Sequence, residues 1–337
     1  MSFSAFIQQA NTLGSQRIPF FFLIDFEKEK PIIVPLEKAI QQGIYYMISG
    51  KSNFTFPTLT DSPTTQAKEK FPITFTPLPI SFAEYQKGFD IVQQELHKGN
   101  TYLLNLSYPT PLCTSATLAD IFIQSQAKYK LWLDQQFVCF SPEPFIRTQH
   151  NTIYTYPMKG TIDATLDNAE QLLLNNEKEK REHYTVVDLL RNDLATVAHS
   201  IEVTRFRYIE RISTARGDIL QTSSEIQGQL DSHWQAHIGT LLDKLLPAGS
   251  ISGAPKEKTV QIIQQAERIS RGYYTGVFGL FDGENIDSAV AIRFIEQRDH
   301  QFYFRSGGGI TAQSDVEEEY KELIQKVYIP FQPSTSK

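Results

Sequence analysis

The sequence is poor in cysteine and has no long apolar run. Only Cys113 and Cys139 occur among its 337 residues, which excludes a disulfide-dense scaffold and fits a reducing cytosol. No segment approaches the roughly 20 apolar residues that span a bilayer, and the first residues lack the basic region and apolar core of a signal peptide. We therefore expect a soluble, cytoplasmic protein without a membrane partner.

Clustered positive charge is also missing. The formal net charge is -6 at pH 7, the pI is about 5.7, and basic residues are scattered instead of forming a stripe. This pattern argues against nucleic acid as a partner. The 7 histidines accompany no cysteine cluster, which argues against a zinc site.

Apolar residues, in contrast, are abundant enough for a core. Hydrophobic residues make up 41% of the chain, so disorder is not the default expectation. Strand-like and helix-like segments are mixed without a regular βαβ alternation, and no break divides the chain. We therefore expect one α+β domain over residues 1–337, with a short strand region at 1–80 and the motif-bearing part at 81–330.

Hydrophobic periodicity locates the expected elements. Apolar residues spaced three and four apart predict helices over residues 81–98, 177–193, 255–268 and 315–327. Apolar or β-branched runs predict strands over residues 20–26, 31–34, 101–108, 137–141, 153–156, 274–281, 287–296 and 301–306. The stretch at 51–79, rich in Thr, Pro and Ser, predicts a surface loop.

Lys159 is the first candidate for chemistry. It follows the strand-like residues 153–156, so we expect it at the end of a strand, where Gly160 lets the backbone turn tightly or approach a ligand. A lone lysine at such a place is usually an exposed surface residue. The alternative is an amine nucleophile, which requires a depressed pKa and a nearby electrophile.

Carboxylates on two of the predicted helices could bind a metal ion. Glu319, Glu322 and Lys326 share one helix face because they stand at i, i+3 and i+7, although such a run usually marks a solvated face. The glycines at 307–309 predict a flexible backbone that approaches a ligand or another segment. Glu182 lies on the polar side of an earlier helix, and two carboxylates from separate helices, with water and a substrate carboxylate, suit Mg²⁺.

Two further features could bind anions. Residues 247–256 form a small-residue loop that opens a helix, which is either an anion cradle or a structural turn; its spacing excludes a Walker A loop. Arg293 follows an apolar run at 289–292. A buried guanidinium requires an anion, so Arg293 predicts either an internal ion pair or a clamp for a substrate carboxylate.

Taken in order, six segments of this chain resemble the chorismate-utilising enzymes, which include anthranilate synthase component I, aminodeoxychorismate synthase component I, and the isochorismate and salicylate synthases. The matching segments are residues 141–143, 157–161, 182–193, 249–256, 291–293 and 307–322. The resemblance implies a layered β core of two packed sheets with outer helices. Lys159 is typical of aminodeoxychorismate synthases, whereas anthranilate synthases carry alanine there. Leu103 stands where isochorismate and salicylate synthases carry a water-activating lysine, which disfavours hydroxylation at C2.

The resemblance also implies individual roles. Lys159 would add to C2 of chorismate while Glu143 protonates the departing C4 hydroxyl, and ammonia would then attack C4 and expel the lysine, giving 4-amino-4-deoxychorismate. Glu182 and Glu322 would hold Mg²⁺, with Glu319 behind a bridging water. The residues expected to bind the substrate are Thr161, Gly253, Ala254, Tyr274, Arg293, Gly308 and Lys326.

The chain also departs from the family pattern. Glu210 stands where the family usually carries a catalytic histidine, so either Glu210 replaces it in proton transfer or the alignment is shifted there. The N-terminal region is short, so the tryptophan pocket of longer relatives is expected to be reduced or absent. No glutaminase segment is present, so the resemblance implies a separate glutamine amidotransferase subunit that supplies ammonia, with free ammonia as a substitute.

Two alternatives stay open. Anthranilate synthase component I would add ammonia at C2, which Lys159 argues against. A non-catalytic chorismate-binding relative would have lost its activity together with the family histidine. The retained residues Glu143, Lys159, Glu182, Arg293 and Glu322 argue against that second alternative.

Overall fold

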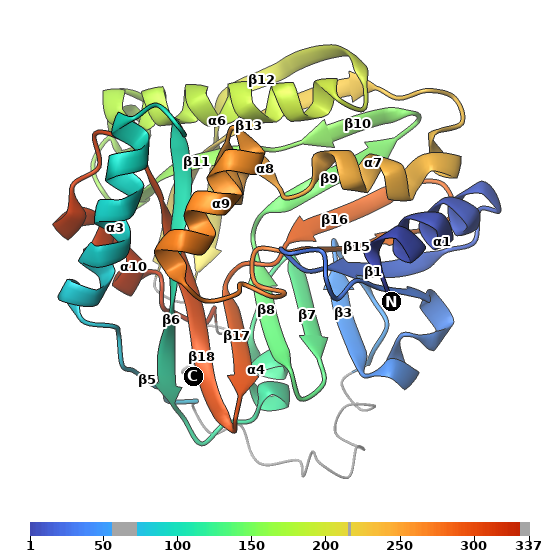
Figure 1. Ribbon diagram of the computed structural model, residues 1–337, viewed down its shortest axis with the longest axis horizontal. Coiled ribbons are helices and arrows are strands. Elements are labelled where there is room, and N and C mark those ends of the chain that lie inside the picture. Colours follow the sequence, from blue (N-terminus) through green and yellow to red (C-terminus); the bar gives the residue numbers. More distant parts are fainter. Residues whose placement is uncertain (56–72, 215–216, 331–337) are drawn as a thin grey trace.

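Two packed antiparallel sheets form the centre of the protein, and helices cover their outer sides (Figure 1). The computed structural model describes residues 1–55, 73–214 and 217–330. Each sheet contains nine strands within these residues. The expected layered α+β architecture is therefore confirmed.

The first sheet has the strand order β11-β13-β10-β9-β16-β15-β1-β2, with β12 beside β13. Its strands are β1 (Phe20–Ile24), β2 (Ile32–Pro35), β9 (Pro144–Gln149), β10 (Thr152–Thr155), β11 (Met158–Asp163), β12 (His199–Thr214), β13 (Gly217–Gln229), β15 (Val277–Phe281) and β16 (Ile286–Val290). The N-terminal strands β1 and β2 thus share a sheet with strands from the C-terminal half of the chain.

The second sheet has the order β14-β6-β18-β17-β8-β7-β3-β4, with β5 beside β6. Its strands are β3 (Ile44–Ile48), β4 (Lys51–Ser52), β5 (Thr76–Pro77), β6 (Leu103–Cys113), β7 (Tyr129–Leu133), β8 (Phe137–Ser141), β14 (Gly253–Ala254), β17 (Phe294–Arg298) and β18 (Gln301–Ile310). Of the segment expected to be a surface loop, residues 56–72 lie outside the described residues.

The α-helices lie mainly over the first sheet and beside β6 and β18 (Figure 1). They are α1 (Phe3–Ser15), α3 (Phe82–His97), α4 (Leu118–Gln124), α5 (Ala169–Leu174), α6 (Glu177–Ala195), α7 (Ile238–Leu245), α8 (Gly249–Ser252), α9 (Lys256–Glu267) and α10 (Val316–Gln325). Short 3₁₀ helices cover Leu36–Lys38, Ile40–Gln42 and Trp234–His237. Side-chain caps fix the start of three helices that were expected from the sequence, because Ser81, Asn176 and Asp315 accept backbone N–H groups of α3, α6 and α10. None of the helices in the described ranges has the length and apolar character that crossing a lipid bilayer demands.

Strand β1 shows why an uninterrupted apolar run suits this core. Phe20 and Phe22 belong to the apolar cluster under the helices, whereas Phe21 and Leu23 belong to the cluster between the two sheets. Successive side chains of a strand point to opposite faces, so a strand that is covered on both faces has no polar position. A third apolar cluster lies on the outer face of the second sheet beneath α4.

The expected single strand over residues 287–296 is wrong. The chain leaves the first sheet after β16 and enters the second sheet at β17, and Arg293 in between has a left-handed φ of 52°. A non-glycine residue in that conformation ends regular strand pairing. The apolar pattern continued across the bend because both flanking strands are buried.

The expected flexible segment at residues 307–309 is also corrected, because these glycines belong to β18. They pair with Ser107, Leu106 and Asn105 of β6. A Cβ atom on Gly307 would lie 2.7 Å from the carbonyl oxygen of Leu106. The glycines are therefore explained by close backbone approach within a sheet.

A buried ion pair between Glu267 and Arg271 connects the end of α9 to neighbouring elements. Arg271 is 1% exposed and Glu267 is 4% exposed. The Arg271 guanidinium donates to both carboxylate oxygens of Glu267 at 2.9 and 2.6 Å, to the Ile251 carbonyl at 3.0 Å and to the Asn105 carbonyl at 2.6 Å. The pair thereby links α8 and α9 to β6.

Replacing Glu267 with Gln should lower the free energy of unfolding by about 3–5 kcal/mol, because it leaves the buried charge of Arg271 uncompensated. Urea unfolding followed by circular dichroism would measure the change. The matched control is Glu84→Gln, which breaks an exposed pair with Lys87 and should cost at most about 1 kcal/mol. Equal losses in the two variants would contradict the structural role of the buried pair.

Candidate active site

Four glutamates and two lysines meet where α6, α10, β11 and β18 come together. The Lys159 ammonium lies 2.7 Å from Glu182 of α6, and Lys326 lies 2.5 Å from Glu322 of α10. Glu319 is one turn before Glu322 on α10 and accepts a hydrogen bond from Ser314 at 2.8 Å. The structure thus brings together the three carboxylates and both lysines that the sequence singled out.

Lys159 occupies a β-bulge. Met158 pairs with Ser223 and Thr161 pairs with Gln221, so one residue too many stands on β11. Gly160 has a φ of +90°, and a Cβ atom there would lie 3.2 Å from a carboxylate oxygen of Glu179. Lys159 is therefore not the end of the strand at 152–155, as expected, but the second residue of the next strand.

The environment of Lys159 keeps its ammonium charged. Its side chain is 28% exposed and its partner Glu182 is 18% exposed. Burial lowers the pKa of Lys159, but the negative charges of Glu182, Glu322 and Glu179 outweigh burial, so the net pKa is raised. A neutral amine at this position requires that the charge of Glu182 be drawn away.

The remaining carboxylates influence one another. Burial and the neighbouring carboxylates raise the pKa of Glu179, and burial likewise raises that of Glu319. Burial also opposes ionisation of Glu322, but the ammonium of Lys326 overrides it and lowers the pKa of Glu322. Within the described residues, one carboxylate oxygen of Glu179 is buried without a hydrogen-bond partner.

Gly308 leaves space for the carboxylates of this cluster. A Cβ atom on Gly308 would lie 3.2 Å from an oxygen of Glu319 and 3.8 Å from an oxygen of Glu322. The backbone of β18 can therefore approach the carboxylates closely. Lys326 completes this contact, because its ammonium donates to the Gly307 carbonyl at 2.9 Å.

Glu143 and Arg293 lie where the chain passes between the two sheets. Glu143 stands between β8 and β9, and Arg293 stands between β16 and β17. The two connections are hydrogen-bonded to each other: the Val290 N–H donates to the Glu143 carbonyl at 3.1 Å, and the Phe140 N–H donates to the Arg293 carbonyl at 3.1 Å. The backbone therefore fixes the main chain of Glu143 and Arg293 relative to one another.

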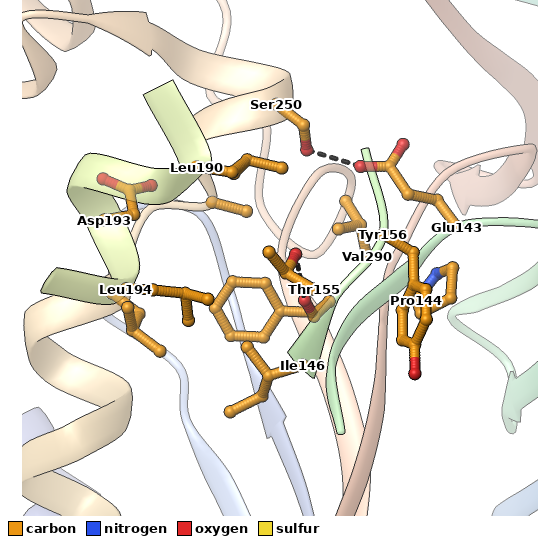
Figure 2. A pocket seen from close by; sticks show the side chains of 13 residues that line it. Glu143, Pro144, Ile146, Thr155, Tyr156, Leu190, Asp193, Leu194, Ser250 and Val290 are labelled. Carbon is orange, nitrogen blue, oxygen red and sulfur yellow. Dashed lines mark hydrogen bonds between the residues drawn. The ribbon is translucent and has the colours of Figure 1, made fainter. Parts of the chain in front are cut away.

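Glu143 can carry a proton at this place. Burial raises its pKa, and the raising effect exceeds the lowering effects of a hydrogen bond from Ser250, of Arg293 and of Lys326. The Ser250 hydroxyl donates to one carboxyl oxygen of Glu143 (Figure 2). The other oxygen is left to hold or give a proton.

Arg293 has no carboxylate within ion-pair distance among the described residues, so the expected alternative of an internal ion pair is not formed there. Its Nε donates to the Tyr328 hydroxyl at 3.4 Å, and its guanidinium lies 5.2 Å from the centre of the Tyr328 ring.

Three other sequence-predicted substrate positions lie in buried or paired backbone. Tyr274 is 3% exposed, and the guanidinium of Arg305 lies 5.2 Å from the centre of the Tyr274 ring. Gly253, with a φ of +128°, and Ala254 form β14 and pair with Leu104 and Leu103.

Thr161 and Glu210, which the sequence resemblance places at the site, both stand beside β13. Thr161 and Glu210 both pair with Gln221, from opposite sides of β13, and both are exposed. Glu210 accepts a hydrogen bond from Ser223. Since side chains alternate along a strand, both residues share the face of β13 opposite to Thr222, which donates to the Lys159 carbonyl.

The structure also shows residues that the sequence did not single out. Glu179 lies three residues before Glu182, and Glu319 and Glu322 on α10 have the same spacing. This repeated spacing was the sequence signal that could have identified Glu179 as a member of the cluster. His183 is buried, its ring Nε2 lies 2.7 Å from the Ser224 hydroxyl, and burial lowers its pKa to about 4, so it is neutral. Nothing in the sequence indicated that Ser250 contacts Glu143.

The chain is similar to several known proteins. The chain matches the family described as chorismate binding enzyme over residues 21–331. It is 62% identical over 327 residues to an uncharacterized PabA-like protein of Haemophilus influenzae, covering 97% of each chain, and 30% identical over 287 residues to aminodeoxychorismate synthase component 1 of Bacillus subtilis, covering 80% of this chain and 60% of that protein. A solved structure of a putative 2,3-dihydroxybenzoate-specific isochorismate synthase, DhbC, from Bacillus anthracis matches the fold with a TM-score of 0.69 at 19% identity, covering 96% of this chain and 87% of that chain. The protein belongs to the family of chorismate-binding enzymes.

Proposed function

We propose that this protein is an aminodeoxychorismate synthase component I, which replaces the C4 hydroxyl of chorismate with ammonia to give 4-amino-4-deoxychorismate. The observation that carries the proposal is the amine of Lys159, held 2.7 Å from Glu182 inside the carboxylate cluster. An amine so placed can form a covalent bond to the substrate. The likeness to the Bacillus subtilis protein named aminodeoxychorismate synthase component 1 supports this reaction.

We further propose Mg²⁺ as the cofactor. In the described part of the chain, no three His, Cys, Asp or Glu side chains converge closely enough to hold a metal ion as they stand, because Glu182 and Glu322 are each turned to a lysine. The cluster nevertheless fits a hard cation: it offers only carboxylate oxygens, one of Glu179 lacks a partner, and Gly308 leaves space beside Glu319. Glu182 and Glu322 would bind the ion directly, with Glu319 and Glu179 behind water. When bound, Mg²⁺ would hold the ring carboxylate and offset the repulsion between a dianionic substrate and the glutamates.

Each residue then has a task in the amination. With its charge drawn to a bound cation, Glu182 would no longer stabilise the proton of Lys159, and the neutral amine would add to C2 while Glu143 gives its proton to the departing C4 hydroxyl. Ammonia attacks C4, the bond between Lys159 and C2 breaks, and the new C4 ammonium returns a proton to Glu143. Arg293 and Lys326 supply positive charge for the substrate carboxylates.

We also propose a source of the ammonia and a cellular location of the protein. Ammonia would come from a separate glutamine amidotransferase subunit, with free ammonia as a substitute. The two cysteines are both free in the structure, which supports a reducing, cytoplasmic location.

Incubation of the protein with chorismate, Mg²⁺ and ammonium chloride at mildly alkaline pH should yield aminodeoxychorismate that still carries its enolpyruvyl group. Mass spectrometry of the products would identify it. Anthranilate as the product would show that ammonia adds at C2 and would refute the proposed reaction. Bound chorismate without any product would favour the non-catalytic alternative.

In the same assay, Lys159→Ala should lower the amination rate roughly a thousandfold or more, because the covalent step is lost. Chorismate binding in the presence of Mg²⁺, measured by equilibrium dialysis, should persist. The matched control is Lys180→Ala on α6, which removes a lysine that is 40% exposed and paired with Glu177 and should leave the rate nearly unchanged. A Lys159→Ala variant with full activity would exclude the covalent role.

Gly308→Ala should raise the Mg²⁺ concentration that gives half-maximal activity about tenfold, equivalent to 1.4 kcal/mol. The added methyl group would lie 3.2 Å from Glu319 and would displace its carboxylate. Calorimetric titration with Mg²⁺ would measure the same shift without turnover. The control is Gly309→Ala, whose methyl group meets only the flexible Leu103 side chain at 3.3 Å; an equal response of both variants would remove these glutamates from the metal site.

A further inference from the structure

A small cavity lies directly beside Glu143, between α6 and strands of the first sheet (Figure 2). Glu143 and Ser250 line one side and Asp193 lines the other, as Figure 2 shows. Between them the lining is mainly hydrocarbon, including Leu190, Ile146 and Val290. The reaction steps given above use Glu143 but leave this space without a role.

The size of the cavity limits its occupant to one small molecule. Its volume is ≈ 20 Å³, and a cavity needs about 10–15 Å³ by this measure to hold one water. Chorismate, with its ring and two carboxylates, does not fit. Water and ammonia do.

The lining favours a neutral occupant. A cation in a largely hydrocarbon cavity loses its hydration without compensation. The one further carboxylate, Asp193, is already engaged, because it lies 3.0 Å from the Lys256 ammonium and also accepts the Gly249 N–H. Glu143 is protonated more readily than an ordinary carboxyl group because it is buried.

Hydrogen-bond acceptors for a neutral N–H donor are nevertheless present. The Ser250 hydroxyl donates to Glu143, and the Thr155 hydroxyl donates to the Phe145 carbonyl at 3.1 Å. Each hydroxyl oxygen therefore keeps a free lone pair. Both residues line the cavity.

We propose that this cavity holds the ammonia molecule that attacks the substrate, next to the carboxyl group that protonates the departing hydroxyl. This inference rests on the proposed function and adds the place from which the nucleophile arrives. Neutral ammonia forms the bond to C4, and the bond between C2 and the Lys159 nitrogen breaks. The C4 ammonium then loses one proton to the Glu143 carboxylate, which had given its own proton to the hydroxyl that left as water.

Two substitutions change the volume of the cavity in opposite directions. Val290→Leu adds one methylene and should raise the KM for ammonia about tenfold, with the KM for chorismate unchanged. Leu190→Ala enlarges the cavity and should reduce the preference for ammonia over methylamine about tenfold. Rates with ammonium chloride and methylammonium chloride, with products separated by mass, would measure both effects.

Matched controls come from the apolar cluster beneath α4, which lies on the other sheet. Val138→Leu and Leu118→Ala repeat the two changes at buried positions there and should leave both ratios unchanged. Thermal melts would identify variants that do not fold. Thr155→Val, which keeps the volume and removes one hydroxyl, provides an independent variant and should raise the KM for ammonia severalfold.

The outcomes separate the two proposals. An aminated product from the unaltered protein, together with unchanged ammonia KM and amine preference in the folded cavity variants, would overturn the ammonia site and leave the reaction standing. Failure of the unaltered protein to aminate chorismate would overturn both. Selective changes in the cavity variants alone would support the site.

Discussion

The balance of charge around Lys159 is the interaction on which the site depends. Four glutamates from two helices would repel one another if they were brought together alone, and the ammonium groups of Lys159 and Lys326 offset this repulsion. Gly160 and Gly308 supply the room, because a side chain at either position would press on a carboxylate. The arrangement joins α6 to α10 through opposite charges.

The second constraint is the passage of the chain between the sheets. Glu143 and Arg293 stand in two neighbouring connections that are joined by backbone hydrogen bonds. Their relative position therefore follows from main-chain geometry and not from side-chain packing alone. Strands β8 and β16 end at this place and strands β9 and β17 begin there, so polar side chains can stand beside two large apolar cores.

Local patterns in the sequence predicted four of the described helices, α3, α6, α9 and α10, and the main charged residues. The apolar periodicity of α3, α6 and α10 lies within each segment, and the spacing of Glu319 and Glu322 is likewise local. The break at Arg293 could not be predicted, because strands on either side of the bend are equally apolar. Long-range contacts, such as Ser250 with Glu143, leave no periodic signal.

The register of strand pairing could not be predicted from the sequence either. The sequence resemblance assigned Thr161 to substrate binding and Glu210 to proton transfer, and their register on β13 places both on the face opposite to Thr222, which contacts Lys159. A one-residue change of register exchanges the two faces of a strand, and the bulge at Lys159 and Gly160 makes such a change. The face on which Thr161 lies therefore depends on a local irregularity of β11 that composition does not reveal.

Under the proposed reaction, Glu143 and Lys159 face opposite requirements at one pH, since the carboxyl must hold a proton and the amine must lack one. Burial satisfies the first requirement by raising the pKa of Glu143. The carboxylates oppose the second by raising the pKa of Lys159. The amine becomes reactive only when the charge of Glu182 is redirected, so the site couples the nucleophile to prior occupation of the carboxylate cluster. Under the proposal, such coupling would keep a reactive amine from forming while the carboxylate cluster holds no cation.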